Sequence, residues 1–174
     1  DFEYKGAVNA MGPLVNPADY SAPGMLWAPL QYTSLASMNA AQALLLTYSE
    51  VQFNLAEAAE KGYISGGSGA AETYYLNGIA SQFDYYASRI GNMYANSYLQ
   101  LSGSDVIPDA SYYTQPGVAY TGTADEKLQK IALQKWLSLL FVGYEAWSEW
   151  RRTGFPEITV GTAGPGYIAR RVMY

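Results

Sequence analysis

The chain of 174 residues contains no histidine and no cysteine. Without cysteine, these residues offer no disulfide, no thiolate metal site and no thiol nucleophile. Without histidine, a Ser-His-Asp triad is excluded as well. Most proton transfer by enzymes near neutral pH relies on histidine. The composition therefore points away from an enzyme.

Basic residues are scarce: Lys and Arg number 10 against 15 Asp and Glu, which gives a net charge of −5. A nucleic-acid-binding protein needs a basic surface, so we expect no nucleic-acid partner. An anionic membrane surface would repel the chain for the same reason. Long hydrophobic runs are also missing. Runs such as residues 43–46 and 139–142 fall far below the roughly 18 residues that a membrane-spanning helix needs.

What the chain does contain is apolar and aromatic material. It is 49% hydrophobic, with 17 Tyr, 5 Phe and 4 Trp. This is enough to build the core of one domain, and it argues against disorder. The chain starts at Asp1 without the pattern of a signal peptide, and its last residues form no obvious closing element. We therefore expect it to be part of a longer protein.

Two helices are predicted in the first half of the chain. Thr47 and Glu50 form a capping-box pattern, and apolar residues then recur at helical spacing, which predicts a helix over residues 48–61. A second helix is predicted over residues 70–94, with Ser68 as its N-cap. The connection between them is too short for anything but an antiparallel hairpin.

The strongest helical pattern lies near the C-terminus. Thr123 and Glu126 form another capping box, and an apolar stripe follows at helical spacing. Arg151 and Arg152 suit the last turn of a helix, and Gly154 suits its end. We therefore predict one helix that continues from the capping box to Gly154.

No convincing pair of strands is found, so the sequence predicts an all-α fold. Proline and glycine interrupt residues 1–46, which are predicted to be an irregular loop region. Residues 47–154 are predicted to form the helical core, and residues 155–174 an irregular tail. Because one helix pair cannot bury both of its faces, we expect pairs to stack as they do in helical repeat proteins.

Two pairs of acidic residues could carry chemistry. Glu145 and Glu149 project from one face of a helix, and paired carboxylates can hydrolyse glycosidic bonds. The adjacent arginines at 151–152 favour a salt-bridge network instead. Glu50 and Glu57 fall on nearly the same face of their helix and could meet the same arginines. We interpret both pairs as structural.

Other signals for a metal or a cofactor are weak. Asp105 and Asp109 flank a proline in a loop, but they lack the alternating pattern of a calcium loop. Residues 65–69 are rich in glycine, but no strand precedes them and no Gly-Lys-Ser/Thr ending follows. They are predicted to form the turn of the helical hairpin. The sequence predicts no metal and no cofactor.

Aromatic residues in the proline- and glycine-rich loops are the candidates for ligand binding. A ring presented on a loop can stack on the C–H face of a sugar while neighbouring polar side chains bind its hydroxyls. Packing against the core is the commoner explanation for any single ring. The candidate ligand-binding residues are Trp27, Tyr32, Tyr112, Tyr113 and Tyr120.

The third predicted helix resembles the signature of the SusD/RagB family of nutrient-binding outer-membrane lipoproteins. The resemblance is carried by KIALQKWL at 130–137, GYEAW at 143–147 and EWRRTGFP at 149–156. Residues 46–51 (LTYSEV) and 56–59 (AEAA) are similar to another helix of the family. The run from Trp136 to Gly154 is the most specific part.

This resemblance implies an all-α protein built on tetratricopeptide-like helix pairs with long irregular loops. Family members are longer than this chain and are anchored at the cell surface of the outer membrane through an N-terminal lipidated cysteine. That residue is absent here, so anchoring would use a part of the protein outside this chain. The members form a lid on a SusC-like TonB-dependent transporter, and they are not enzymes.

The resemblance therefore implies a C-terminal part of a single SusD-like domain that captures oligosaccharides and passes them to the transporter. Two alternatives stay open. The protein could be a peptide-binding lid of the same transporter type, or a helical protein–protein scaffold without its own ligand site. The family's ligand site lies in variable loops, so its motifs assign no binding residue here.

Overall fold

The computed structural model describes residues 43–93, 103–140 and 142–158. Its elements are all helical, and these ranges contain no strand, which confirms the all-α prediction. In chain order they are α2 (Tyr48–Glu60), α3 (Gly67–Met93), the 3-10 helix η3 (Gly103–Val106), α4 (Ala110–Tyr113), α5 (Ala124–Ser138) and α6 (Glu145–Thr153). The irregular regions predicted before residue 43 and after residue 158 lie outside the described residues.

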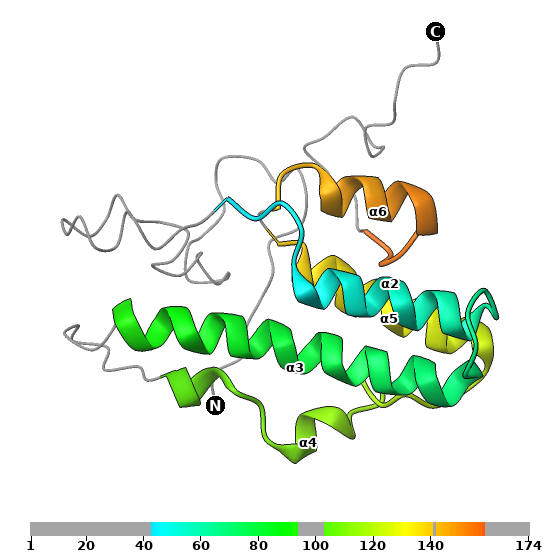
Figure 1. Cartoon of the computed structure of the whole chain (residues 1–174), viewed down its shortest axis with the longest axis horizontal. Helices are drawn as coiled ribbons and strands as arrows, with labels where there is room; N and C mark the ends of the chain where they lie inside the picture. Colours follow the sequence, from blue (N-terminus) through cyan, green and yellow to red (C-terminus); the bar gives the residue numbers. More distant parts are fainter. Residues whose placement is uncertain (1–42, 94–102, 141, 159–174) are drawn as a thin grey trace, which may run out of the picture.

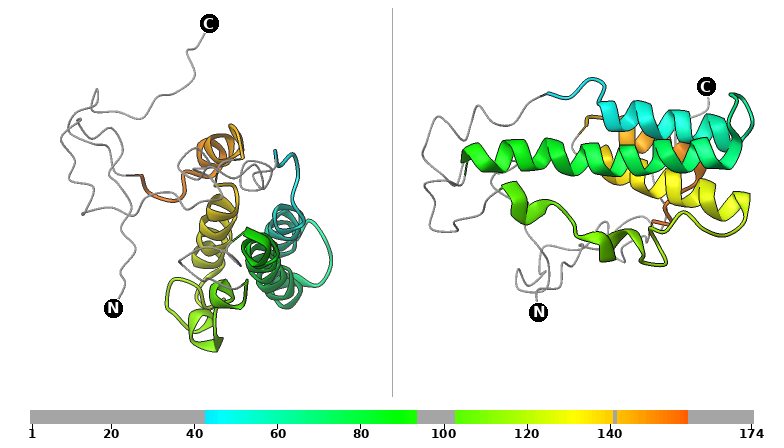
Figure 2. Two further views of the ribbon diagram at one scale, coloured as in Figure 1. Left: turned by 90° about the vertical axis from the view of Figure 1, so that its left-hand side faces the viewer. Right: turned by 60° about the horizontal axis from the view of Figure 1, so that its bottom comes forward.

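α2 and α3 form the predicted antiparallel hairpin, and α5 packs against both (Figures 1 and 2). The Thr47 hydroxyl caps α2 by accepting a hydrogen bond from the Glu50 amide at 3.1 Å. At the other end, Gly62 has a φ of 75° and donates its amide to the Ala59 carbonyl at 3.0 Å. The predicted bounds of α2 are therefore confirmed to within one residue.

The start of α3 differs from the prediction. The helix begins at Gly67, so Ser68 lies in the first turn and is not the N-cap. Gly66 and Gly67 have φ values of 107° and 55°, which glycine adopts far more readily than other residues. The glycines thus make the turn themselves. The Ser68 hydroxyl instead accepts a hydrogen bond from the Lys127 ammonium at 2.7 Å, linking α3 to α5.

The prediction of a single helix up to Gly154 is wrong. α5 ends at Ser138, and α6 begins only at Glu145. The amide of Leu139 is shared between two carbonyls of the last turn of α5, and Gly143 has a φ of 50°. Apolar residues continue through the break, so the sequence pattern does not reveal it. The break lets α6 fold back beside α2 and α5 (Figure 1).

The core lies between α2, α3 and α5. Its fully buried members include Phe53, Ala56, Tyr75, Ile79 and Ile131. The rings of Phe53 and Tyr75 meet edge to face with their centroids 6.2 Å apart. The buried Tyr75 hydroxyl donates to the Val118 carbonyl at 2.7 Å, so the loop before α5 is held against α3.

An ionic network joins α2, α5 and α6. Lys135 donates to Glu149 at 2.7 Å, and both side chains are almost completely buried. Arg152 contacts the other oxygen of Glu149 at 2.6 Å and forms a two-pronged pair with Glu57, at 2.7 and 2.5 Å. Lys61 contacts Glu57 at 2.6 Å. The predicted structural role of Glu57 and Glu149 is confirmed, because arginine–carboxylate geometry of this kind fixes how helices meet.

We expect Lys135→Met to lower the free energy of unfolding by about 3 kcal/mol, because it removes one partner of a buried pair. Urea denaturation followed by circular dichroism measures this change. The matched control is Lys61→Met, which breaks a more exposed pair with Glu57 and should cost less than about 1 kcal/mol. Equal losses in the two variants would contradict the account.

We expect Gly78→Ala to destabilise the protein by about 1 to 3 kcal/mol through overpacking. A Cβ atom at this position would lie 2.7 Å from Cε1 of Phe53, whose ring is fixed in the core. The control is Gly69→Ala in the first turn of α3, where a Cβ meets nothing within 4 Å. Alanine there should stabilise the helix slightly. Thermal unfolding of both variants tests this, and a stabilising Gly78→Ala would contradict it.

Candidate functional site

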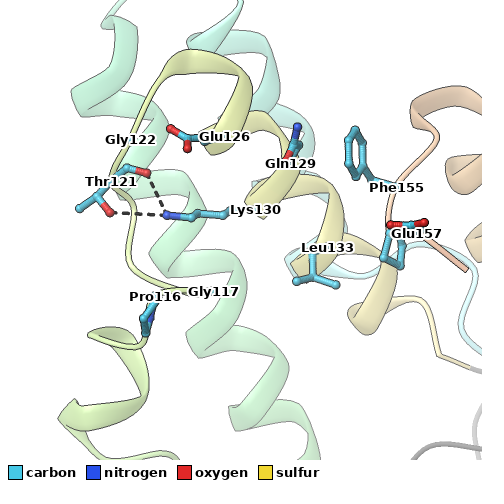
Figure 3. Close-up of a pocket in the computed structure, with 11 residues that line it drawn as sticks. Pro116, Gly117, Thr121, Gly122, Glu126, Gln129, Lys130, Leu133, Phe155 and Glu157 are labelled. Atoms are coloured by element: carbon cyan, nitrogen blue, oxygen red, sulfur yellow. Dashed lines mark hydrogen bonds between the residues drawn. The ribbon is translucent and has the colours of Figure 1, made fainter.

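A pocket of about 410 Å³ lies along the outer side of α5. One wall is the loop of residues 116–122, and the opposite wall is the segment of residues 155–157 that follows α6 (Figure 3). From α5 itself, Glu126, Gln129 and Leu133 face the pocket. The site therefore combines three parts of the chain, and the folding back of α6 brings the segment of residues 155–157 to the other two.

The capping box of α5 forms one end of this pocket. The Thr123 amide donates to the Glu126 carboxylate at 2.7 Å, and the Glu126 amide donates to the Thr123 hydroxyl at 3.3 Å. This confirms the capping box predicted for the helix start. Gly122 has a φ of 104°, and a Cβ there would lie 2.5 Å from the Glu126 carboxylate. The glycine and the cap together fix the position of Glu126.

Lys130 holds the loop wall in place. Its ammonium donates to the Ala119 carbonyl at 2.7 Å and to the Thr121 carbonyl at 2.9 Å. Figure 3 shows the side chain pointing from α5 toward this loop and away from Phe155. Lys130 thus shapes the pocket by binding the protein's own backbone.

The opposite wall is positioned by the end of α6. Gly154 has a φ of 77° and ends the helix, as predicted. The Thr153 hydroxyl accepts a hydrogen bond from the Phe155 amide at 3.1 Å. The Trp150 indole donates to the Pro156 carbonyl at 3.0 Å. These bonds turn the chain back so that Phe155 and Glu157 face α5.

The pocket thus combines a half-buried phenylalanine ring with an amide and two carboxylates. This is the kind of surface that binds a polyhydroxylated ring by stacking and hydrogen bonding. The hydrogen bonds from Thr123 lower the pKa of Glu126, so its carboxyl group stays ionised near neutral pH. Glu126 is consequently unsuited to act as a general acid.

A protein-family model for SusD-like proteins, described as starch-binding and associating with the outer membrane, matches residues 3–174. The chain belongs to this family. The resemblance seen in the sequence from residue 46 onward is therefore confirmed, and the match extends it toward the start of the chain. Comparison with curated proteins and with solved structures gave no match. The family is a binding family, and its description associates it with carbohydrate and with the outer membrane.

None of the helices in the described ranges combines the length and hydropathy needed to cross a membrane. Within the same ranges, no group of three or more acidic side chains is arranged to hold a metal ion. Asp109, one of the two residues considered for calcium, instead caps α4 by accepting a hydrogen bond from the Ser111 amide at 2.7 Å. The glycine-rich residues 65–69 form the predicted hairpin turn and the first turn of α3.

The described candidate rings lie outside the pocket. Tyr120 is only 8% exposed, and its hydroxyl donates to Glu60 at 2.7 Å. Tyr112 and Tyr113 are half-buried and meet edge to face at 5.5 Å. Trp27 and Tyr32 lie outside the described residues. A role in ligand binding stays a prediction for all five rings.

The residues of the wall opposite the loop, at 155–157, were not predicted as site residues from the sequence. Phe155 and Pro156 look like a simple helix end, and Glu157 carries no motif of its own. The only available signal was that a ring and a carboxylate directly follow the glycine that ends the last helix. Gln129 was missed because a single amide on a helix surface is uninformative.

The pair of carboxylates considered for glycoside hydrolysis, Glu145 and Glu149, does not form a catalytic pair. Glu145 is exposed, whereas Glu149 lies buried between Lys135 and Arg152. Burial raises the pKa of Glu149, but the hydrogen bonds and charges of Arg152 and Lys135 outweigh it and lower the pKa overall. Glu149 therefore stays charged and stabilises the network.

Lowering the pH should remove the stabilisation that the ionised Glu57 side chain provides. Burial raises the pKa of Glu57, but hydrogen bonds from Arg152 and Lys61 lower it overall from 4.5 to about 2. Because the folded pKa is depressed, the contribution is complete above pH 4.5 and is lost as the pH falls toward 2.

We therefore expect wild-type stability to fall more steeply than that of Glu57→Gln over the same pH range. Urea unfolding at a series of pH values measures both slopes. Glu145→Gln, which removes an exposed carboxylate, should keep the wild-type slope. Parallel profiles for wild type and Glu57→Gln would contradict this assignment.

Proposed function

We propose that the chain is part of a cell-surface lipoprotein that captures oligosaccharides at the outer membrane. It passes them to a SusC-like TonB-dependent transporter without making or breaking a bond. The observation that carries the proposal is the family match over residues 3–174. Anchoring would use a lipid attached to a part of the protein outside this chain. The composition, which lacks histidine, supports binding without catalysis.

The pocket beside α5 supports a carbohydrate ligand. Phe155 supplies an apolar face for the C–H groups of a sugar ring. Gln129 supplies both a donor and acceptors, and Glu157 supplies acceptors for hydroxyl groups. Because the pocket is open to the surface along α5, a chain of several sugars could extend beyond it in the manner of an oligosaccharide.

The helical scaffold is the alternative that a specific observation favours. Tyr120 packs against Tyr75 with ring centroids 5.1 Å apart, and Tyr112 packs against Phe83 at 5.4 Å. Such contacts stabilise the fold, and they leave Tyr120 little free ring surface. If the remaining loop rings behave in the same way, the chain would serve to present a helical surface to the transporter.

We expect Phe155→Ala to weaken the binding of maltoheptaose, a starch-derived oligosaccharide, by about tenfold, because the stacking face is lost. Isothermal titration of the full-length protein measures the affinity, and circular dichroism checks the fold. The matched control is Tyr63→Ala, which removes a ring that is 78% exposed in the turn between α2 and α3. The affinity of the Tyr63→Ala variant for maltoheptaose should equal that of the wild type.

Trp27→Ala, measured in parallel, tests the competing loop site. Weakening by Trp27→Ala together with an unaffected Phe155→Ala would contradict the pocket and place the ligand on the loop region. Binding of peptides without binding of any oligosaccharide would favour the peptide-binding lid. The absence of both would contradict ligand capture and favour the scaffold.

A further inference from the structure

The charged groups around the pocket beside α5 are unevenly available to a ligand. Among the described residues that line it, Lys130 is the only cationic one, whereas Glu126 and Glu157 are both acidic. Figure 3 shows Glu157 beside Phe155 on one wall, and Glu126 and Lys130 on the side of α5 and the loop. The charge that a ligand meets therefore depends on which of these groups is already satisfied.

The Lys130 ammonium has three N–H donors, and the protein itself accepts from it at three places. The acceptors are the Ala119 carbonyl at 2.7 Å, the Thr121 carbonyl at 2.9 Å and the Thr121 hydroxyl at 3.5 Å. Releasing the ammonium to a ligand would break the bonds that hold the loop wall against α5. Lys130 is therefore a poor partner for an anionic group in the pocket.

The carboxylates are placed differently. Glu126 is fixed at the helix start by its bonds to Thr123 and remains ionised. Glu157 is exposed on the opposite wall. An ionised carboxylate only accepts hydrogen bonds. The pocket thus offers negative charge and acceptors, with Gln129 as its main side-chain donor.

We propose that this pocket selects saccharides by charge: it binds neutral or amine-bearing sugars and rejects those that carry carboxylate or sulfate groups, with Glu157 as the selecting residue. The inference rests on the proposed function and specifies the substrate class of the same site. A hydroxyl or ammonium group donates to Glu157, whereas an acidic sugar brings a second negative charge, and Lys130, the one cation among the described residues that line this pocket, is already bonded to the loop. Like-charge contacts of this kind exclude ligands efficiently.

The test uses one oligosaccharide in three forms. The full-length protein is titrated with maltoheptaose, with the same oligosaccharide oxidised to carboxylates at its primary alcohols, and with the form carrying amines at those positions. We expect the oxidised form to bind about tenfold more weakly than maltoheptaose. This ratio should shrink when salt is raised, because the groups are accessible to solvent.

Glu157→Gln keeps the size and the hydrogen-bonding oxygen of the side chain but removes its charge. We expect it to reduce the preference for maltoheptaose over the oxidised form by about threefold, because the like charge that opposes the oxidised form is removed. The matched control is Glu145→Gln, which removes an exposed charge from α6 outside the pocket. It makes the same change to the net charge of −5 and should leave the preference unaltered.

The outcomes separate the two proposals. Equal binding of the neutral and oxidised forms would overturn charge selection while leaving oligosaccharide capture intact. An equal effect of Glu145→Gln and Glu157→Gln would overturn the role of Glu157, because the overall charge of the protein would then explain the preference. If none of the three forms binds, the proposed function itself fails, and the charge selection fails with it.

Discussion

The contact on which the arrangement of this protein depends is the buried ion pair between Lys135 and Glu149. Arg152 extends it from α6 to Glu57 on α2, so that one network ties together three helices. Replacing such a network by apolar residues is often neutral for stability, but removing one partner leaves a buried charge. We therefore regard it as the device that fixes the position of α6. The position of α6 in turn determines where the following segment, which carries Phe155, lies in the pocket.

Part of this arrangement could be predicted from the sequence, because it follows from local chemistry. The caps at Thr47 and Thr123 and the helix end at Gly154 each need only a few neighbouring residues. The break before α6 could not be predicted, because the apolar stripe continues on both sides of it. A glycine such as Gly143 can lie within a helix at some cost or take the positive φ of a turn, so its presence in the sequence does not reveal the break.

The candidate site was harder to predict than the fold for a related reason. Its walls come from the loop before α5, from α5 and from the segment after α6, and the sequence gives no signal that these parts meet. The aromatic residues that attract attention in the sequence are partly used elsewhere: Tyr120 packs on Tyr75 within the core. A residue's chemistry is readable from the sequence, but its availability to a ligand depends on what the folded chain has already bound.

Membership of a starch-binding family that associates with the outer membrane gives this pocket its most direct interpretation. The decisive measurement is a crystal structure of the full-length protein with a bound maltooligosaccharide. The account predicts a sugar ring stacked on Phe155, with hydroxyl groups within hydrogen-bond distance of Gln129 and Glu157. A sugar bound only at other residues, with the pocket beside α5 left to solvent, would contradict it.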